Sequence, residues 1–210
     1  MSSVDWEEAY RSVEHNVDDR IAKIREFGLD NTSMRVLDLG CGDGIDLDAF
    51  RHLGFSDVYG IDISASLLKV LYEKGEGGEY TVLNSDVYAI ALQNGSVDLV
   101  YGNNVLHHFI ELERAIAEIR RVLRTGGLFC FAEPRATWFR RFVDLITLSP
   151  VSRMSKTLNF RRIILEEEMD DYHHWLSIQG GLFNLIERSG FKLVEAPQGL
   201  FRLFAKWEAV

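Results

Sequence analysis

The stretch Val36-Leu37-Asp38-Leu39-Gly40-Cys41-Gly42-Asp43-Gly44 decides the fold of this chain. A short apolar run containing an acid passes into three glycines that alternate with other residues. Glycine lets the backbone turn tightly and lets a ligand approach with no Cβ atom in the way. A buried strand followed by such a turn and then a helix is typical of the nucleotide-binding edge of doubly wound α/β proteins.

The spacing of these glycines differs from the dinucleotide fingerprint. That fingerprint, G-x-G-x-x-G, would need glycine at position 45, where this chain has Ile45. The chain reads G-x-G-x-G instead, with Asp38 two residues before the first glycine. Val36–Gly44 thus resembles the first motif of class I S-adenosylmethionine-dependent methyltransferases. Within this class, the chain is similar to the type 11/25 methyltransferases that act on small molecules. The resemblance implies S-adenosyl-L-methionine as cofactor, S-adenosyl-L-homocysteine as product, and a Rossmann-like fold.

Strand and helix patterns alternate between residues 35 and 132. Apolar runs at 35–39, 58–62, 80–83, 97–101 and 128–132 indicate strands, with helices over 45–53, 64–71 and 112–123 and a turn over 124–127. A helix over 182–188 and strands over 191–194 and 200–205 follow, and the two strands favour an antiparallel hairpin. We predict an α/β fold with a doubly wound, seven-stranded, mostly parallel sheet. One strand near the C-terminus is antiparallel, and helices cover both faces.

Composition narrows the class of protein. With 210 residues, 47% of them hydrophobic, we expect a single domain over 1–210. The net charge of −9 argues against nucleic acid as a partner. Cys41 and Cys130 give neither a disulfide framework nor a metal motif. Because no signal peptide or membrane span is evident, we expect a cytoplasmic monomer or homodimer without stable membrane insertion.

Two segments lie outside the alternating pattern. In the N-terminal segment (1–30), apolar residues from Trp6 to Ile24 recur every three or four positions and predict a helix over 5–27. This helix either packs on the sheet or, as the resemblance implies, covers the cofactor with Trp6 or Tyr10.

The second segment, 134–177, is an insertion where related enzymes often have a substrate cover. Its first part is basic, with aromatic residues interleaved, and acidic residues follow. The basic residues are Arg135, Arg140, Arg141, Arg153, Lys156, Arg161 and Arg162. We expect either a helical lid with solvated or paired charges, or a pocket for an apolar or anionic substrate, which could be associated with a membrane surface.

Polar or glycine residues stand at four successive strand ends, where ligands of open α/β sheets bind. Asp62 follows the first glycine by 22 residues, the place of an acid that accepts ribose hydroxyls. The resemblance implies adenine contacts at Asp86 and Val87 and methionine contacts at Gly102 and Asn103. A lone acid at a strand end is as often a helix cap. The expected cofactor contacts are Asp38, Gly40, Cys41, Gly42, Asp62, Ile63, Asp86, Val87, Gly102 and Asn103.

Methyl transfer is a direct displacement, so the chain needs a base only if the acceptor loses a proton. His107, His108, Glu133 and His174 are candidates, although a structural or cofactor-lining role is favoured for His107 and His108. Adjacent histidines are expected to point to different sides of an element, so we predict no metal site.

The sequence therefore favours a methyltransferase that acts on a small molecule. An oxygen or carbon acceptor is favoured, because Gly102-Asn103-Asn104-Val105 replaces the N-P-P-Y motif of amino-group methyltransferases. One alternative is a protein that binds S-adenosylmethionine as a sensor or partner subunit without transferring its methyl group. Another is a nicotinamide oxidoreductase.

Overall fold

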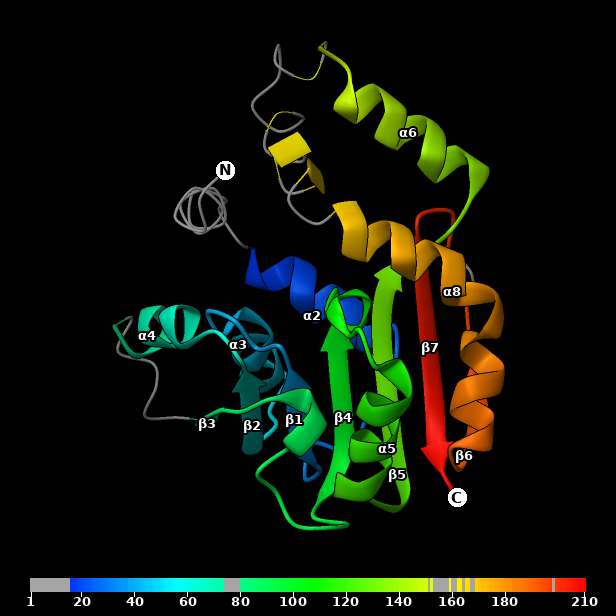
Figure 1. The fold of residues 1–210 in the computed structure, drawn as a ribbon. Coiled ribbons are helices and arrows are strands. Elements are labelled where there is room, and N and C mark those ends of the chain that lie inside the picture. Colours follow the sequence, from blue (N-terminus) through cyan, green and yellow to red (C-terminus); the bar gives the residue numbers. More distant parts are fainter. Residues whose placement is uncertain are drawn as a thin grey trace.

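The computed structural model describes residues 16–73, 80–150, 152, 159, 162–163, 165–166, 169–197 and 199–210. Seven strands form one sheet in the order β3-β2-β1-β4-β5-β7-β6 (Figure 1). Their bounds are β1 Arg35–Leu39, β2 Asp57–Asp62, β3 Thr81–Asn84, β4 Val97–Asn103, β5 Leu123–Pro134, β6 Phe191–Glu195 and β7 Arg202–Ala209. All neighbours pair in parallel except β7, which is antiparallel to β5 and β6. The predicted sheet, with one reversed strand, is confirmed.

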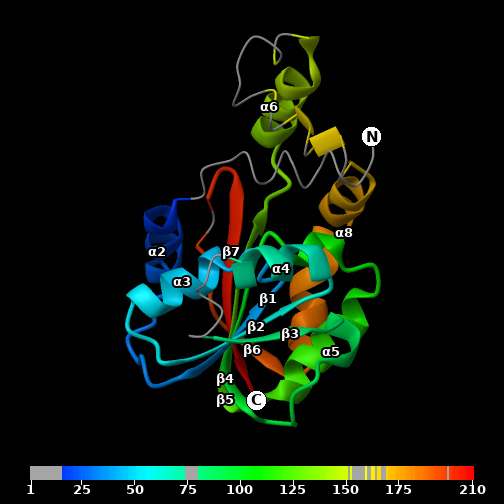
Figure 2. The ribbon, with the colours of Figure 1, turned by 90° about the vertical axis from the view of Figure 1, so that its left-hand side faces the viewer.

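Helices cover both faces of the sheet (Figure 2). Helices α2 (Val17–Arg25), α3 (Ile45–His52) and α4 (Ala65–Glu73) contribute to one core, together with Phe50 and Tyr101. On the other face, α5 (Leu112–Val122) and α8 (Met169–Arg188) pack with the short helices η1 (Val87–Ala89) and η2 (Leu106–His108). Helix α6 (Trp138–Leu148) extends beyond the sheet.

Strand β1 lies between β2 and β4, at the point where the order of strands along the chain reverses. Its residues Val36, Leu37 and Leu39 are buried, because helices cover a parallel strand on both sides and its sequence is therefore a continuous apolar run. Ligands of such sheets bind beyond the carboxyl ends of the strands at this reversal. The fold thus predicts a ligand site at the turn after Leu39.

Several boundaries differ from the sequence-based expectations. The helix expected over 5–27 does not run through Asn16: Asn16 is extended, and its side chain accepts a hydrogen bond from the Asp18 amide, so α2 starts at Val17. Residues 5–15, with Trp6 and Tyr10, lie outside the described residues. Residues 124–127, expected as a turn, are part of β5 and form an irregularity in its pairing with β4.

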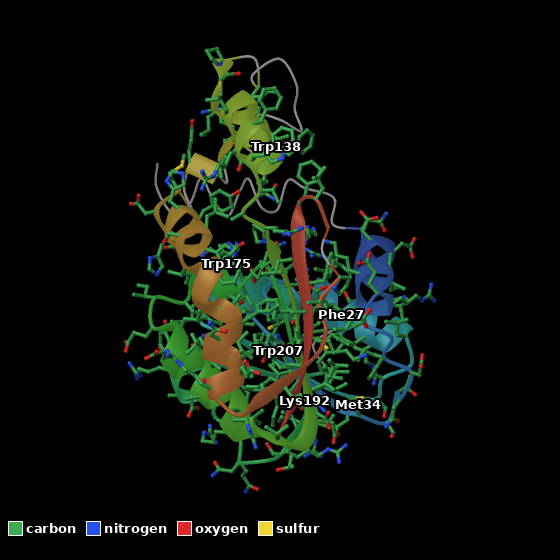
Figure 3. All side chains as sticks on the ribbon, turned by 90° about the vertical axis from the view of Figure 1, so that its right-hand side faces the viewer. Phe27, Met34, Trp138, Trp175, Lys192 and Trp207 are labelled. Carbon is green, nitrogen blue, oxygen red and sulfur yellow. The ribbon has the colours of Figure 1, made fainter. Side chains whose placement is uncertain are left out.

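The insertion is also shorter than expected at its C-terminal end. Residues 169–177 belong to α8, which continues without a break through the predicted helix over 182–188. The indole of Trp175 anchors α8, since its Nε1 donates a hydrogen bond to the Pro134 carbonyl at the end of β5 over 2.8 Å. Figure 3 shows Trp175 and Trp207 in the body of the molecule and Trp138 on α6. In the described parts of the chain, none of the helices has both the length and the apolar character needed to span a bilayer.

Candidate functional site

The glycine turn after β1 is held tightly against its neighbours. Gly40, Gly42 and Gly44 all have positive φ, a region that side chains with a Cβ rarely occupy. At Gly40 there is a second reason for glycine, because a Cβ atom would lie 2.5 Å from the side chain of Val105. The turn therefore needs glycine for both its conformation and its packing.

Asp62, at the end of β2, fixes the shape of this turn. Its Oδ2 accepts a hydrogen bond from the Gly42 amide over 2.8 Å, and its Oδ1 accepts one from the Ser64 amide over 2.7 Å. A carboxylate oxygen can accept more than one hydrogen bond, so both atoms keep capacity for a ligand. Ile63, which follows it, exposes its apolar side chain.

Cys41 turns inward from the same turn. Its thiol packs against Gly60, where a Cβ atom would lie 2.7 Å from the sulfur. Burial and the nearby carboxylates of Asp38 and Asp62 raise the pKa of this thiol above its usual range. A neutral, buried thiol is a poor nucleophile, so only the backbone of Cys41 is available to a ligand.

Two buried acids beside the turn keep oxygen atoms without a hydrogen-bond partner among the described residues. These atoms are Oδ2 of Asp38, on β1, and Oδ1 of Asp46, in the first turn of α3. Burial, and then the charge of Asp46, raise the pKa of Asp38 well above its usual range. Unsatisfied buried carboxylates are costly, so this position suits a ligand that brings a cation or hydrogen-bond donors.

The groups around these two acids come from elements far apart in the sequence. Asn103, at the end of β4, donates to Asp46 Oδ2 over 3.2 Å and accepts from Arg202 on β7 over 3.4 Å. Arg20, on α2, lies 3.8 Å from Asp46. The sequence predicted Asp38 and Asn103. It contained no local signal for Arg20, Arg202 or Asp46, because their proximity depends on the packing of four elements.

The pKa of Lys23, on α2, is affected by the same two cations, Arg20 and Arg202. Burial, together with the charges of Arg202 and Arg20, lowers its pKa to about 8. Both positive and negative groups thus lie at the carboxyl ends of β1 and β4 and at the start of β7.

These groups fit S-adenosylmethionine. Its methionine portion carries an ammonium group that matches the orphaned oxygens of Asp38 and Asp46, and a carboxylate that matches the nearby cations. The role of each individual residue toward the cofactor is a prediction.

The remaining predicted contacts lie at the next strand ends. Asp86 follows β3 and caps η1, since its Oδ1 accepts the Tyr88 amide over 2.9 Å, and Val87 beside it is buried. Gly102 is the penultimate residue of β4 and packs against Val105 and Leu106. The cap accounts for one oxygen of Asp86 and leaves the other for the predicted adenine contact.

Glu133 and His107 form a buried pair. Glu133 Oε1 accepts hydrogen bonds from the amides of Val105 and Leu106 over 2.7 and 2.8 Å, and its Oε2 lies 2.7 Å from His107 Nδ1. This carboxylate, predicted as a candidate base, therefore holds η2 against the end of β5.

The other two histidines occupy different surroundings. His108 Nδ1 lies 3.4 Å from Asp171 of α8. The ring centroids of His107 and His108 are 4.1 Å apart, but the two side chains contact different elements, His107 at β5 and His108 at α8. His174 lines a groove between α8 and the start of α5, with Ile110 and Leu182, and no residue of the glycine turn takes part in that groove.

Comparison with known proteins agrees with this geometry. Residues 37–131 match a family model described as a methyltransferase domain. The chain is 35% identical over 102 residues to a ubiquinone biosynthesis O-methyltransferase of Thiobacillus denitrificans, covering 47% of this chain and 43% of that protein. It is 32% identical over 102 residues to a malonyl-[acyl-carrier protein] O-methyltransferase of Pectobacterium atrosepticum, covering 49% and 39%.

The chain therefore spans less than half the length of these two curated relatives. Among solved structures, an S-adenosylmethionine-dependent methyltransferase from Mesorhizobium loti has a TM-score of 0.66. The match covers 92% of this chain and all of that one at 19% identity, which shows a shared fold.

Proposed function

We propose that this chain, whose residues 37–131 form a methyltransferase domain of the S-adenosylmethionine-dependent family, transfers a methyl group to a small-molecule acceptor. The observation that carries this proposal is the pair of buried acids beside the glycine turn, since Asp38 Oδ2 and Asp46 Oδ1 have no hydrogen-bond partner among the described residues. When bound, the cofactor supplies an electrophilic methyl group on a sulfonium. Holding two bound reactants in line lowers the barrier of such a displacement by roughly 7–11 kcal/mol.

The chain's own residues would bind and orient the reactants. We assign the ammonium group to Asp38 and Asp46, the ribose hydroxyls to Asp62, and the adenine to Asp86 and Val87. Asp62 would act twice, because the same carboxylate holds the Gly42 amide. Ile63 would cover the nucleoside with its exposed side chain.

The acceptor is proposed to be apolar and to bind under the insertion. A cavity of about 360 Å³ lies between α6 and α8, lined mainly by aliphatic side chains such as Leu145, Leu165 and Leu176. Small-molecule sites are concave and mostly apolar, with a few polar groups, and this size falls within their usual range. The polar side chains of this cavity are Arg141, Asp144, Tyr172, His173 and Ser177.

An oxygen or carbon acceptor atom fits this proposal best. Two relatives are named O-methyltransferases, and the amino-group motif is replaced at 102–105. If the acceptor loses a proton, His108 is a better candidate than Glu133, because Glu133 already accepts two backbone hydrogen bonds and contacts His107.

Thermal unfolding with candidate ligands tests the cofactor. A ligand present at 100 times its Kd stabilises the folded state by about 2.7 kcal/mol, which corresponds to roughly 5–10 °C in Tm for a chain of this length. We expect this shift with S-adenosylhomocysteine. A shift with a nicotinamide dinucleotide alone would overturn the proposal.

Matched variants then test the ribose assignment. Asp62→Ala should weaken S-adenosylhomocysteine binding at least about tenfold, through lost hydrogen bonds to a charged group. Asp57→Ala, which changes an exposed acid at the other end of β2, should leave the Kd unchanged. Equal Kd values for both variants would contradict the assignment.

Activity is tested by incubation with methyl-labelled cofactor and a metabolite extract. We expect label in a small organic molecule. Tight cofactor binding without transfer to any component would instead favour the sensor or partner-subunit alternative.

A further inference from the structure

Helix α6 has its polar and apolar faces reversed relative to an ordinary surface helix. Trp138, Phe142 and Ile146 expose 79, 54 and 39% of their surface, respectively. Asp144 and Thr147, on the opposite side of the helix, are buried. A surface helix normally packs its apolar stripe inward. The outward side of α6 is therefore unusual.

The inward polar side is fixed by specific contacts with α8. Tyr172 of α8 donates a hydrogen bond to Asp144 over 2.7 Å, and the Arg140 guanidinium pairs with the same carboxylate over 3.2 Å. That guanidinium also lies 5.4 Å from the centre of the Tyr172 ring. A rotation of α6 that buried its apolar side would break these contacts. The exposed apolar side is thus a property of the packed helix.

The apolar surface continues onto the connection before β7. Leu200 and Phe201 are exposed there, and Thr137, the residue that caps α6, donates a hydrogen bond to the Leu200 carbonyl over 3.0 Å. The ring of Phe139 lies 5.1 Å from that of Phe201. We define the α6 face as Trp138, Phe142, Leu145, Ile146, Leu200 and Phe201. Figures 1 and 2 show α6 projecting from the body at the end where β4 and β5 finish.

Charge indicates what covers this face. Between residues 134 and 162 the sequence has seven basic residues and one acid, Asp144, in a chain whose net charge is −9. Arg141, next to the apolar residues on α6, is exposed. A two-fold contact with a second copy would bring the same basic segment against itself. A protein partner would need a groove for a projecting helix, whereas a bilayer interface accepts one directly.

We propose that the α6 face docks the protein on an anionic lipid surface. Exposed aromatic and aliphatic side chains enter the headgroup boundary, and the exposed guanidinium of Arg141 pairs with lipid phosphates. The cavity between α6 and α8 opens beside Leu145 of this face. Docking would thus bring that cavity to the source of an apolar molecule. The docking itself does not depend on methyl transfer.

Flotation of the full chain with lipid vesicles tests this proposal. We expect binding to vesicles of phosphatidylcholine with 30 mol% phosphatidylglycerol, at least about tenfold weaker binding to pure phosphatidylcholine, and a decrease as salt is raised. Trp fluorescence should shift to shorter wavelength on binding. In a Trp6→Phe background, the shift should be reduced by Trp138→Phe, because Trp175 and Trp207 are buried.

A matched pair of double variants provides the control. Phe142→Ser with Ile146→Ser should reduce vesicle binding at least about tenfold while Tm stays within a few degrees. Leu193→Ser with Val194→Ser changes side chains that are 42 and 50% exposed on the edge strand β6, and should bind like the parent chain.

Three outcomes would overturn the proposal. The first is no binding of the parent chain to anionic vesicles, and the second is equal binding by the two double variants. The third is a dimer, measured by light scattering without lipid, that only the α6 variant abolishes; a second copy would then cover the face.

Discussion

Glu133 joins two parts of the chain that are 26 to 28 residues apart. Its carboxylate accepts the Val105 and Leu106 amides and contacts His107, and the residue is fully buried. As a candidate base it would need a free oxygen directed at an acceptor. Its contacts instead indicate a positioning role for η2, which follows the strand end at Asn103.

Replacement of Glu133 by Ala should reduce the free energy of unfolding by about 3 kcal/mol, because two buried amides lose their acceptor. Urea denaturation measures this loss. Glu133→Gln should lose only about 1 kcal/mol, since its amide oxygen still accepts both hydrogen bonds and its nitrogen can donate to His107. If Glu133→Ala is as stable as the parent chain, the positioning role is wrong.

The glycine turn is the element that orders the site. It begins where β1 ends, and the Asp62 carboxylate and the Ile61 carbonyl accept hydrogen bonds from Gly42 and Cys41. These contacts tie the turn to β2. The conformation of the turn, the end of β2 and the start of α3 therefore depend on one another.

Gly40 and Gly28 offer a matched comparison within the chain. Their φ values are 65° and 58°, but a Cβ at Gly40 would lie 2.5 Å from Val105, whereas nothing lies within 4 Å at Gly28. Gly28→Ala should cost about 1 kcal/mol of unfolding free energy for the left-handed backbone. Gly40→Ala should cost at least about 3 kcal/mol and abolish S-adenosylhomocysteine binding. If thermal denaturation shows equal losses of stability for Gly28→Ala and Gly40→Ala, then the packing of Gly40 against Val105 does not require glycine.

The cluster of charged groups beside the glycine turn depends on the fold of the whole molecule. Arg20 comes from α2, Asp38 from β1, Asp46 from α3, Asn103 from β4 and Arg202 from β7. Asn103 and Arg202 are 99 residues apart in the sequence. Asp38 Oδ2 and Asp46 Oδ1 are buried without a hydrogen-bond partner among the described residues, so these two acids are expected to reduce the stability of the free protein.

The pH dependence of stability tests this cost. Burial raises the pKa of Asp38 in the folded chain, while the unfolded value is about 4. Above pH 4 the unfolded chain loses this proton first, so the folded chain binds more protons and stability falls as pH rises toward the raised pKa. Asp38→Asn should remove this decrease of stability with pH. Without ligand, its free energy of unfolding at pH 8 should exceed that of the parent chain by at least about 1 kcal/mol.

Urea denaturation at pH 5, 6.5 and 8 measures the slope, with Asp57→Asn, an exposed acid, as control. The same variant, Asp38→Asn, should bind S-adenosylhomocysteine at least about tenfold more weakly. If the free energy of unfolding of Asp38→Asn changes with pH as steeply as that of the parent chain, then Asp38 is ionised in the folded protein at no cost in stability.

Local patterns in the sequence were sufficient for the sheet and for the strand ends. Apolar runs such as Val36–Leu39 fix buried strands, glycines with positive φ fix the turn, and Ser64 caps α4 as predicted. These features depend on residues within one turn or one strand of each other. The cofactor class also followed from such a short stretch, because the spacing of the glycines, with Asp38 ahead of them, distinguishes the motif.

The tertiary structure alone decided which distant side chains meet. Arg20 and Arg202 join the cluster beside the glycine turn, Glu133 serves η2, and α6 turns its aromatic side outward because Asp144 is held by Tyr172. None of these has a sequence signal, since each depends on how separate elements pack, and packing is a sum over contacts between residues far apart in the chain. Sequence thus determined the elements and the turn, and packing determined the charges around it.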